Sequence, residues 1–526
     1  MAKRPAAHQP EEHPRKLERR SLASRSWFLY AVVFVCGADL MSLEIIGSRM
    51  LAPYFGNSIF VWGSLISVFL AALSLGYWLG GMAADRWPRH AVLGGLIAVP
   101  GLLVTLLPFV YPGLNRAIAD SGMGVRLGPL LASLILFLVP SIFLGTVSPF
   151  AVRLQAKAVS SVGSTAGTLY AISTAGSIVG TLLTAFYLIP LAGVANIVHG
   201  LGILLLALAA AILAADARPV RAGVILGAAL LLVLAIGWQA RTRAAEPGLL
   251  LETDSFYNHI YLAEQAGIRY MDFENLRQSA MRLDDPFELH LRYTRFLAVA
   301  LSLQPAPKRV LVLGLGGGSF PKRLHRDFPD LTVEVADIDP MVIDVATRYF
   351  QVPQDARMRL HARDGRRFIQ ESDAQYDLIF LDAYNSDTIP FHLATREFYR
   401  EVERRLAPGG VLVSNIIGSL RGPHSAFFRA TYRTLGEVFP TLYTLPVHDP
   451  GYTLSEVNII LLATRDAARL SRSDLMARAG RLGGKLVPAT DLAEYASHLY
   501  ELPIPVADVP VLTDDYAPVD ILRVAL

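Results

Sequence analysis

The chain has 526 residues, of which 53% are hydrophobic and only 18% are charged. Soluble globular proteins carry about 25% charged residues, so this composition excludes an ordinary soluble protein, a disordered chain and a disulfide-rich secreted domain. The formal net charge of +3 is too balanced to indicate a nucleic-acid partner. The one cysteine, Cys36, excludes an internal disulfide and a cysteine-based metal cluster, and we expect no metal site.

Apolar residues are concentrated before residue 241. Seven stretches are long enough to cross a hydrocarbon core of ~30 Å, which takes about 20 helical residues. They are Ser26–Ile46, Ile59–Met82, Ala91–Tyr111, Leu127–Val147, Thr165–Pro190, Ala195–Ala214 and Ala222–Gln239. We therefore expect a solvated basic tail over residues 1–25 and a multi-pass helical membrane domain of about seven spans over residues 26–240.

The orientation of these spans follows from the basic residues in short loops. The tail and the loops after the second, fourth and sixth spans hold thirteen Lys or Arg residues, against three in the opposite loops. This asymmetry predicts a cytoplasmic N-terminus. Seven spans would then place the C-terminal half outside the cytoplasm, unless one stretch is re-entrant.

Few polar residues fall within the spans. Asp39, Glu44 and His199 are the main ones, and carboxylates at membrane depth are costly and often mark a transport or proton pathway. The simpler interpretation is that Glu44 pairs with Arg49 near an interface. A transporter or sensor therefore stays open as one interpretation of this half.

From about Leu249 onward, strand patterns alternate with helical ones, which is typical of a doubly wound α/β sheet. Short alternating runs over residues 249–290 predict a small antiparallel β lid, and residues 291–526 predict a Rossmann-like domain. The strands expected in that domain are Arg309–Leu313, Thr332–Ala336, Met358–His361, Asp377–Leu381, Gly410–Ser414 and Asn458–Ala463.

Four features of a nucleotide-type site each follow one of these strands. A glycine loop, residues 314–318, lets the backbone approach a ligand, and Asp337 stands where a carboxylate accepts hydrogen bonds from ribose hydroxyls. Asp364 and Asp382 follow later strands, where open α/β sheets place their ligands. Singly, Asp337 and Asp364 are also explained as helix caps and Asp382 as a turn residue. Together, in this order, they indicate an adenosyl ligand with a sulfonium tail.

These motifs, in this order, resemble the polyamine aminopropyltransferases, the spermidine synthase family. The residues that carry the resemblance are Glu252, Ser255, Tyr257–Asn258, Ile260, Gln278, the glycine loop, Asp337–Pro340, Asp364–Gly365, Asp382, Phe398–Tyr399 and Leu512–Pro518. The whole layout resembles the bacterial branch that is fused to a multi-pass membrane domain. This implies a class-I-methyltransferase-like fold and a bacterial inner-membrane location, with the lipid bilayer as a partner. It is also compatible with a homodimer.

The resemblance implies transfer of an aminopropyl group from decarboxylated S-adenosylmethionine, as co-substrate, to a diamine such as putrescine, with no permanently bound cofactor. Asp382 matches the proton acceptor. The implied donor-binding residues are Asn258, Gly314, Gly316, Gly317, Asp337, Asp364, Gly365 and Pro390. The implied amine-binding residues are Gln278, His290, Asn385 and Asp387.

The chain departs from the family on the acceptor side. Gly317 and Asn385 stand where the family has aspartates that bind substrate amine, and Leu289–His290 replaces its Tyr-His pair. Asp387 and Glu288 are nearby acids that compensate in our interpretation. The donor site therefore resembles the family more closely than the acceptor site does. An S-adenosylmethionine-dependent methyltransferase on the same fold is the main alternative, since a fold does not fix a function.

Overall fold

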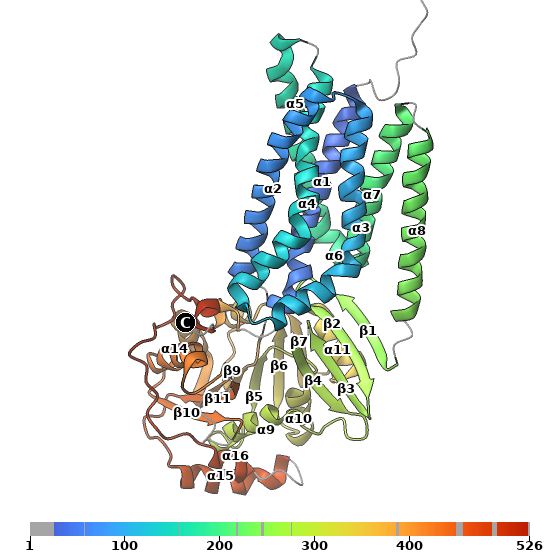
Figure 1. Ribbon diagram of the computed structural model, residues 1–526. Helices are drawn as coiled ribbons and strands as arrows, with labels where there is room; N and C mark the ends of the chain where they lie inside the picture. Colours follow the sequence, from blue (N-terminus) through green and yellow to red (C-terminus); the bar gives the residue numbers. More distant parts are fainter. Residues whose placement is uncertain are drawn as a thin grey trace, which may run out of the picture.

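The computed structural model describes residues 26–56, 58–156, 158–216, 219–243, 247–274, 276–384, 389–448, 456–486 and 492–523. Its N-terminal half is a bundle of long helices that stands on an α/β half (Figure 1). The helices are α1 Ser26–Phe55, α2 Ile59–Arg86, α3 His90–Asp120, α4 Gly124–Gln155, α5 Val162–Leu183, α6 Ile189–Ala192, α7 Val194–Ala215 and α8 Pro219–Arg243. A π-helix, Thr184–Leu188, joins α5 to α6.

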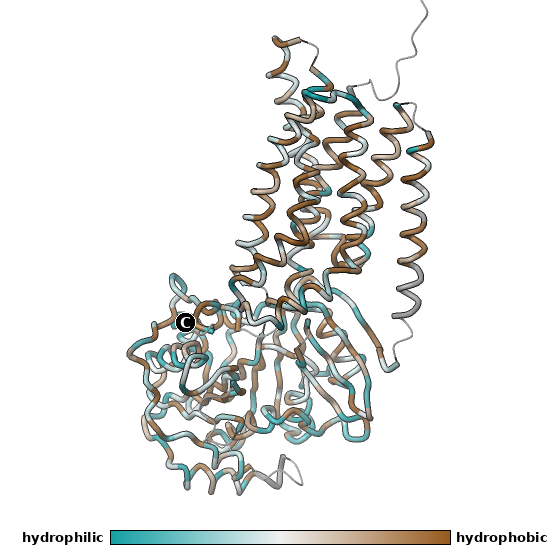
Figure 2. Tube along the Cα trace, viewed as in Figure 1, coloured by the Kyte–Doolittle hydropathy of each residue, from teal (hydrophilic) through white to brown (hydrophobic). Residues whose placement is uncertain are grey.

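Six of these helices are long and apolar enough to cross a membrane: α1 to α4, α5 with its π-helical extension, and α7. The seventh expected span lies in α8, where the apolar stretch is shorter, Val220–Ile236. Figure 2 shows mainly hydrophobic residues along the helices of the bundle, whereas the α/β half mixes hydrophilic and hydrophobic residues. This contrast matches the division that the sequence predicts.

The bundle packs closely where small residues meet. A Cβ atom added at Gly176 would lie 2.1 Å from the carbonyl oxygen of Phe34, and one at Gly180 would lie 2.2 Å from that of Ala38. These contacts let α5 approach α1 at backbone distance, as small residues do in membrane bundles. The carboxylate of Asp39 is buried, with no hydrogen-bond partner among the described residues. Its transport role stays a prediction.

The helices alternate in direction, so α1 begins at the end of the bundle that is far from the sheets, whereas α8 ends near them (Figure 1). The start of α1 and the α/β half therefore lie at opposite ends of the bundle. Whether one of the apolar stretches is re-entrant stays a prediction.

The expected lid is a four-stranded antiparallel sheet in the order β1-β2-β3-β4. Its strands are β1 Leu249–Asp254, β2 His259–Gln265, β3 Ile268–Phe273 and β4 Leu276–Arg282. A short helix, α9 Arg292–Leu297, and a 3-10 turn, Ala298–Ser302, lead from the lid to the larger sheet.

The larger sheet has seven strands in the order β10-β11-β9-β8-β5-β6-β7, with β11 antiparallel to both of its neighbours. The strands are β5 Arg309–Leu313, β6 Thr332–Asp337, β7 Met358–Ala362, β8 Tyr376–Leu381, β9 Leu406–Gly418, β10 Thr441–Pro446 and β11 Val457–Thr464. The helices are α10 Ser319–Asp327, α11 Pro340–Tyr349, α12 Gly365–Glu371, α13 Arg396–Arg405, α14 Ala426–Gly436, α15 Arg472–Leu486, α16 Leu492–Ser497 and α17 Val519–Arg523. All six strands expected from the sequence are present, and β10 is an additional strand.

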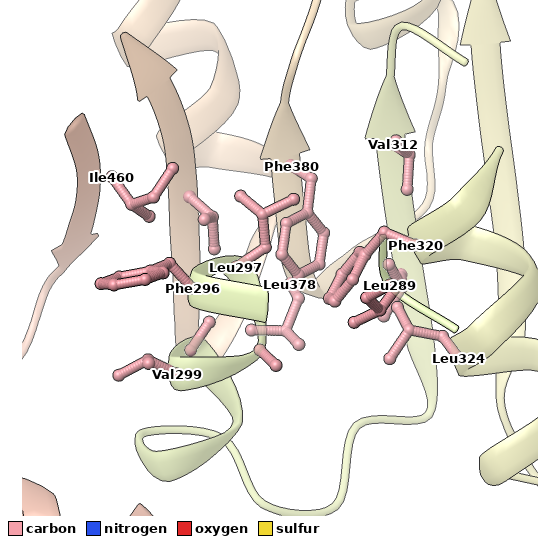
Figure 3. Packing of buried hydrophobic residues seen from close by; sticks show 14 of the residues in the cluster. Leu289, Phe296, Leu297, Val299, Val312, Phe320, Leu324, Leu378, Phe380 and Ile460 are labelled. Atoms are coloured by element: carbon pink, nitrogen blue, oxygen red, sulfur yellow. The ribbon is translucent and has the colours of Figure 1, made fainter. Parts of the chain in front are cut away.

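A single apolar core joins the lid, α9 and one face of the large sheet. Figure 3 shows Leu297 of α9 beside Leu378 and Phe380 of β8, whereas the ring of Phe296 points away from β8 and meets that of Tyr495 at 5.0 Å. The rings of Phe320 and Phe380 meet edge to face at 4.8 Å. This packing fixes α9 and the start of α10 against the strands, and so fixes the groups that follow those strands.

Candidate active site

A cavity of about 670 Å³ lies at the carboxyl ends of the parallel strands, under the lid. Its lining includes the predicted residues Asn258, Gln278, Gly314, Gly316, Asp337, Asp364, Gly365, Asp382 and Pro390. Gly314, with a φ of +93°, sits at the start of the glycine loop, and a Cβ atom there would lie 2.3 Å from the carbonyl oxygen of Asp382. Only glycine allows the loop to turn this close to the end of β8.

Asp337, the last residue of β6, is held by backbone groups. Its Oδ2 accepts the N–H of Leu315 over 2.7 Å, and its Oδ1 accepts the N–H of Asp339 over 2.9 Å. Burial raises the pKa of Asp337 to about 6. The interpretation of Asp337 as the cap of α11 is wrong, because Asp339 fills that role by accepting the N–H of Met341 over 3.0 Å. Asp337 is thus left to face the cavity.

The lid reaches this corner of the cavity through Asp339. Ser255 Oγ and Asn258 Nδ2 both donate to Asp339 Oδ2, the second over 3.1 Å. Asn258 lines the cavity, and its side chain supports the loop after β6. This contact ties the position of the lid to that of Asp337. The role of Asn258 in donor binding stays a prediction.

Asp364 has two roles. Its Oδ1 accepts the N–H of Arg367 over 2.9 Å and caps α12, as the cap interpretation predicts. Its Oδ2 pairs with His392 Nε2 at 2.9 Å, and this hydrogen bond lowers the pKa of Asp364. Gly365 and Pro390 line the cavity beside it. His392 is a cavity residue that the sequence analysis did not identify.

Asp382 follows β8 and is held by side chains that come from distant parts of the chain. The phenol of Tyr293 donates to its Oδ2 over 3.1 Å, and Asn415 Nδ2 donates to its Oδ1 over 2.8 Å. Asn458 Nδ2 in turn donates to Asn415 Oδ1 over 3.0 Å. Burial raises the pKa of Asp382 despite these two hydrogen bonds. A carboxylate in this state is suited to accept a proton.

Gly317 is closed off from the cavity. Its N–H donates to Ser279 Oγ over 2.7 Å, and an added Cβ atom would lie 2.8 Å from both Phe350 Cδ1 and Ser279 Cβ. The family's aspartate therefore has no room at this position.

The other predicted amine-binding residues differ in where they lie relative to the cavity. Gln278 lines the cavity, whereas His290 is not among its lining residues. Asn385 and Asp387 lie outside the described residues. Tyr293, three positions after His290, contacts Asp382 instead. The rule that ligands bind at strand ends, which placed Asp382, would also have identified Asn415. Leu381 of β8 pairs with Ser414 of β9, so the residues that follow them, Asp382 and Asn415, are neighbours. No comparable signal marks Tyr293.

The fold and the cavity at its strand ends define a Rossmann-like α/β enzyme domain. The Spermine/spermidine synthase domain family matches residues 291–469. A polyamine aminopropyltransferase from Vibrio vulnificus is 30% identical over 285 residues, which cover 52% of this chain and 91% of that protein. The chain belongs to the spermine/spermidine synthase family.

Two further similarities extend this comparison. An eEF1A lysine and N-terminal methyltransferase from Xenopus laevis is 30% identical over 231 residues, which cover 40% of this chain and 32% of that protein. Among solved structures, a probable spermidine synthase from Corynebacterium glutamicum has a TM-score of 0.39 and 20% identity, covering 44% of this chain and 87% of that one.

Proposed function

We propose that this protein is a membrane-anchored aminopropyltransferase that moves an aminopropyl group from decarboxylated S-adenosylmethionine to an amine such as putrescine. The observation that carries the proposal is the carboxylate of Asp382, which has a raised pKa and lies in the same cavity as Asp337. Family membership supports it. The proposed donor residues are Asn258, Gly314, Gly316, Asp337, Asp364, Gly365 and Pro390, whereas Gly317 is left out because it does not line the cavity.

The reaction is a displacement at the carbon beside the sulfonium. The neutral amine nitrogen forms the new C–N bond, and the C–S bond breaks with its electron pair left on sulfur, which becomes a neutral thioether. A free amine is mostly protonated at pH 7, so a nearby base must take one proton from the ammonium before it can attack. Asp382 accepts this proton, while Tyr293 and Asn415 hold its carboxylate in place. After the displacement, the positive charge that was on sulfur is on the product nitrogen.

Mass spectrometry of reaction products tests the proposal directly. Purified protein is given either decarboxylated S-adenosylmethionine or S-adenosylmethionine, each with a panel of mono- and diamines. We expect a mass gain of one aminopropyl group with the first donor and no methyl gain with the second. The opposite result would establish the methyltransferase alternative. Adenosyl binding without any turnover would favour a sensor or transporter.

The membrane location is tested by reporters at both ends of the chain. The basic asymmetry predicts a cytoplasmic N-terminus, and the helical bundle places the α/β half at its other end. Adenosyl donors are made inside the cell, which favours a cytoplasmic catalytic half, so the two expectations conflict. A C-terminal reporter active only in the cytoplasm would show that the predicted N-terminal orientation is wrong. One active only outside would require the donor to be supplied there.

A further inference from the structure

The end of the bundle that faces the sheets is joined to the lid from two helices. The guanidinium of Arg49, in α1, donates to the carbonyl oxygen of Phe256. The N–H of Val194, the first residue of α7, donates to Asp254 Oδ2 over 3.0 Å in a buried hydrogen bond. Both acceptors lie in residues 254–259, where the chain turns from β1 to β2, and we call this segment the lid turn.

The other side of the lid turn is joined to the donor side of the cavity. Ser255 Oγ and Asn258 Nδ2 donate to the carboxylate of Asp339, and the N–H of Asp339 donates to Asp337 Oδ1. One segment of six residues thus contacts the ends of two bundle helices and the loop that holds Asp337. A continuous series of contacts therefore connects those helix ends to Asp337.

We propose that Arg49 and Asp254 are positioning residues through which the ends of α1 and α7 set the affinity of the cavity for its adenosyl donor. The proposal rests on the proposed function for the identity of that donor. It gives the membrane helices a role in the reaction besides anchoring, because their arrangement at this end controls the geometry of the donor site.

The charges around the lid turn suit Asp254 to this role. Its side chain is only 7% exposed, and its Oδ1 pairs with His259 Nδ1 at 2.8 Å. Burial opposes a charge on His259, but hydrogen bonds to Asp254 and Glu252 raise the pKa of His259 to about 10. The ring is therefore cationic at neutral pH and keeps Asp254 ionised. An ionised Asp254 binds the first N–H of α7 and His259 at once, which fixes the lid turn to α7.

The test measures donor affinity in full-length protein held in lipid nanodiscs. Calorimetry with decarboxylated S-adenosylmethionine compares wild type with Asp254→Ala and Arg49→Met. We expect the dissociation constant to rise about 3- to 30-fold, the range seen when residues of a coupling network are altered. The turnover number at saturating donor should stay close to wild type, and Arg49→Lys should restore most of the affinity.

The matched control is Arg153→Met. Arg153 of α4 pairs with Asp85 of α2 over 3.1 Å, so it also joins two segments of the bundle but does not contact the lid. It should leave donor affinity unchanged. The double variant Arg49→Met with Ser255→Ala tests whether Arg49 affects donor affinity through the lid turn or through a general loss of protein stability. If Arg49 acts through that turn, the two changes should be less than additive.

Coupling between sites is reciprocal, which gives a second readout. Donor binding should slow hydrogen exchange at the start of α7 in wild type and should not do so in Asp254→Ala. Equal donor affinity in wild type, Asp254→Ala and Arg49→Met, with no donor-dependent protection of α7, overturns this inference. Failure of wild type to bind the donor at all overturns the proposed function instead. If Asp254→Ala does not fold, Arg49→Met and the double variant still decide the question.

Discussion

On the donor side of the cavity Asp337 is held by backbone N–H groups at adjacent strand ends, whereas on the acceptor side Asp382 is held by side chains from distant elements. Asp337 accepts the N–H groups of Leu315 and Asp339 at adjacent strand ends. Asp382 instead depends on Tyr293 and Asn415, which lie 89 and 33 residues away in the chain. The position of Asp337 therefore follows from the backbone of the fold. The position of Asp382 depends on individual side chains, which substitutions can remove.

The largest effect is expected at Asp382. Asp382→Asn keeps a side chain of similar shape but removes the base, so turnover should fall about 10²- to 10⁴-fold, the usual contribution of a positioned general base. Donor affinity, measured by calorimetry, should change little. The control is Asp330→Asn, since Asp330 is a highly exposed acid that pairs with Lys308 on the surface. Loss of donor affinity in Asp382→Asn would contradict the assignment of Asp382 to the acceptor side alone.

Asp337→Ala should act on the donor side alone. If Asp337 holds two ribose hydroxyls by charged hydrogen bonds, its loss costs about 1.5–3 kcal/mol, or about 10- to 150-fold in affinity. Because Asp339 caps α11, the helix should remain, but the N–H groups of Leu315 and Asp339 lose their acceptor, which should lower the free energy of unfolding by about 1–3 kcal/mol. Unchanged affinity for decarboxylated S-adenosylmethionine, measured by calorimetry in the folded variant, would remove Asp337 from the donor site.

The same contrast explains what the sequence could predict. The apolar spans and the parallel strands follow from local patterns, and Asp337, Asp364 and Asp382 follow from the rule that ligands bind at strand ends. His392 and Tyr293 did not follow, because each reaches the cavity through tertiary packing of a short helix rather than through a strand end. The strand β10 was missed because it carries no motif at its end, although it pairs with β11 along its length.

A smaller effect is expected from restoring the family's acids on the acceptor side. Asn385→Asp should raise putrescine turnover about tenfold, because a carboxylate can form a charge-assisted hydrogen bond to the distal ammonium. Asp387→Asn should lower turnover if this acid compensates.

Gly317→Asp is the contrasting variant. Its side chain would meet Phe350 and Ser279, so it should lower the free energy of unfolding by about 1–3 kcal/mol without raising turnover. Steady-state kinetics and thermal unfolding check both results. High wild-type turnover of putrescine that Asp387→Asn leaves unchanged would show that Asp387 does not hold the distal amine.

The last prediction concerns how donor affinity depends on pH. It separates the role of Asp337 from that of Asp382 while the donor stays the same. Burial raises the pKa of Asp337 to about 6, whereas hydrogen bonding by His392 lowers that of Asp364. As pH falls through about 6, Asp337 is the first of these two groups to gain a proton and lose its strength as a hydrogen-bond acceptor. Donor affinity should therefore be constant above pH 7, about twofold weaker near pH 6, and weaker by up to tenfold per pH unit below that.

Calorimetry at several pH values isolates this titration, because it records donor binding without the amine. Asp337→Asn should bind weakly at every pH and lack the fall near pH 6. Asp382→Asn should keep that fall, since its carboxylate serves the acceptor and not the donor. A fall that disappears in Asp382→Asn would mean that the acceptor-side carboxylate also contacts the donor. The two sides of the cavity would then titrate as one site.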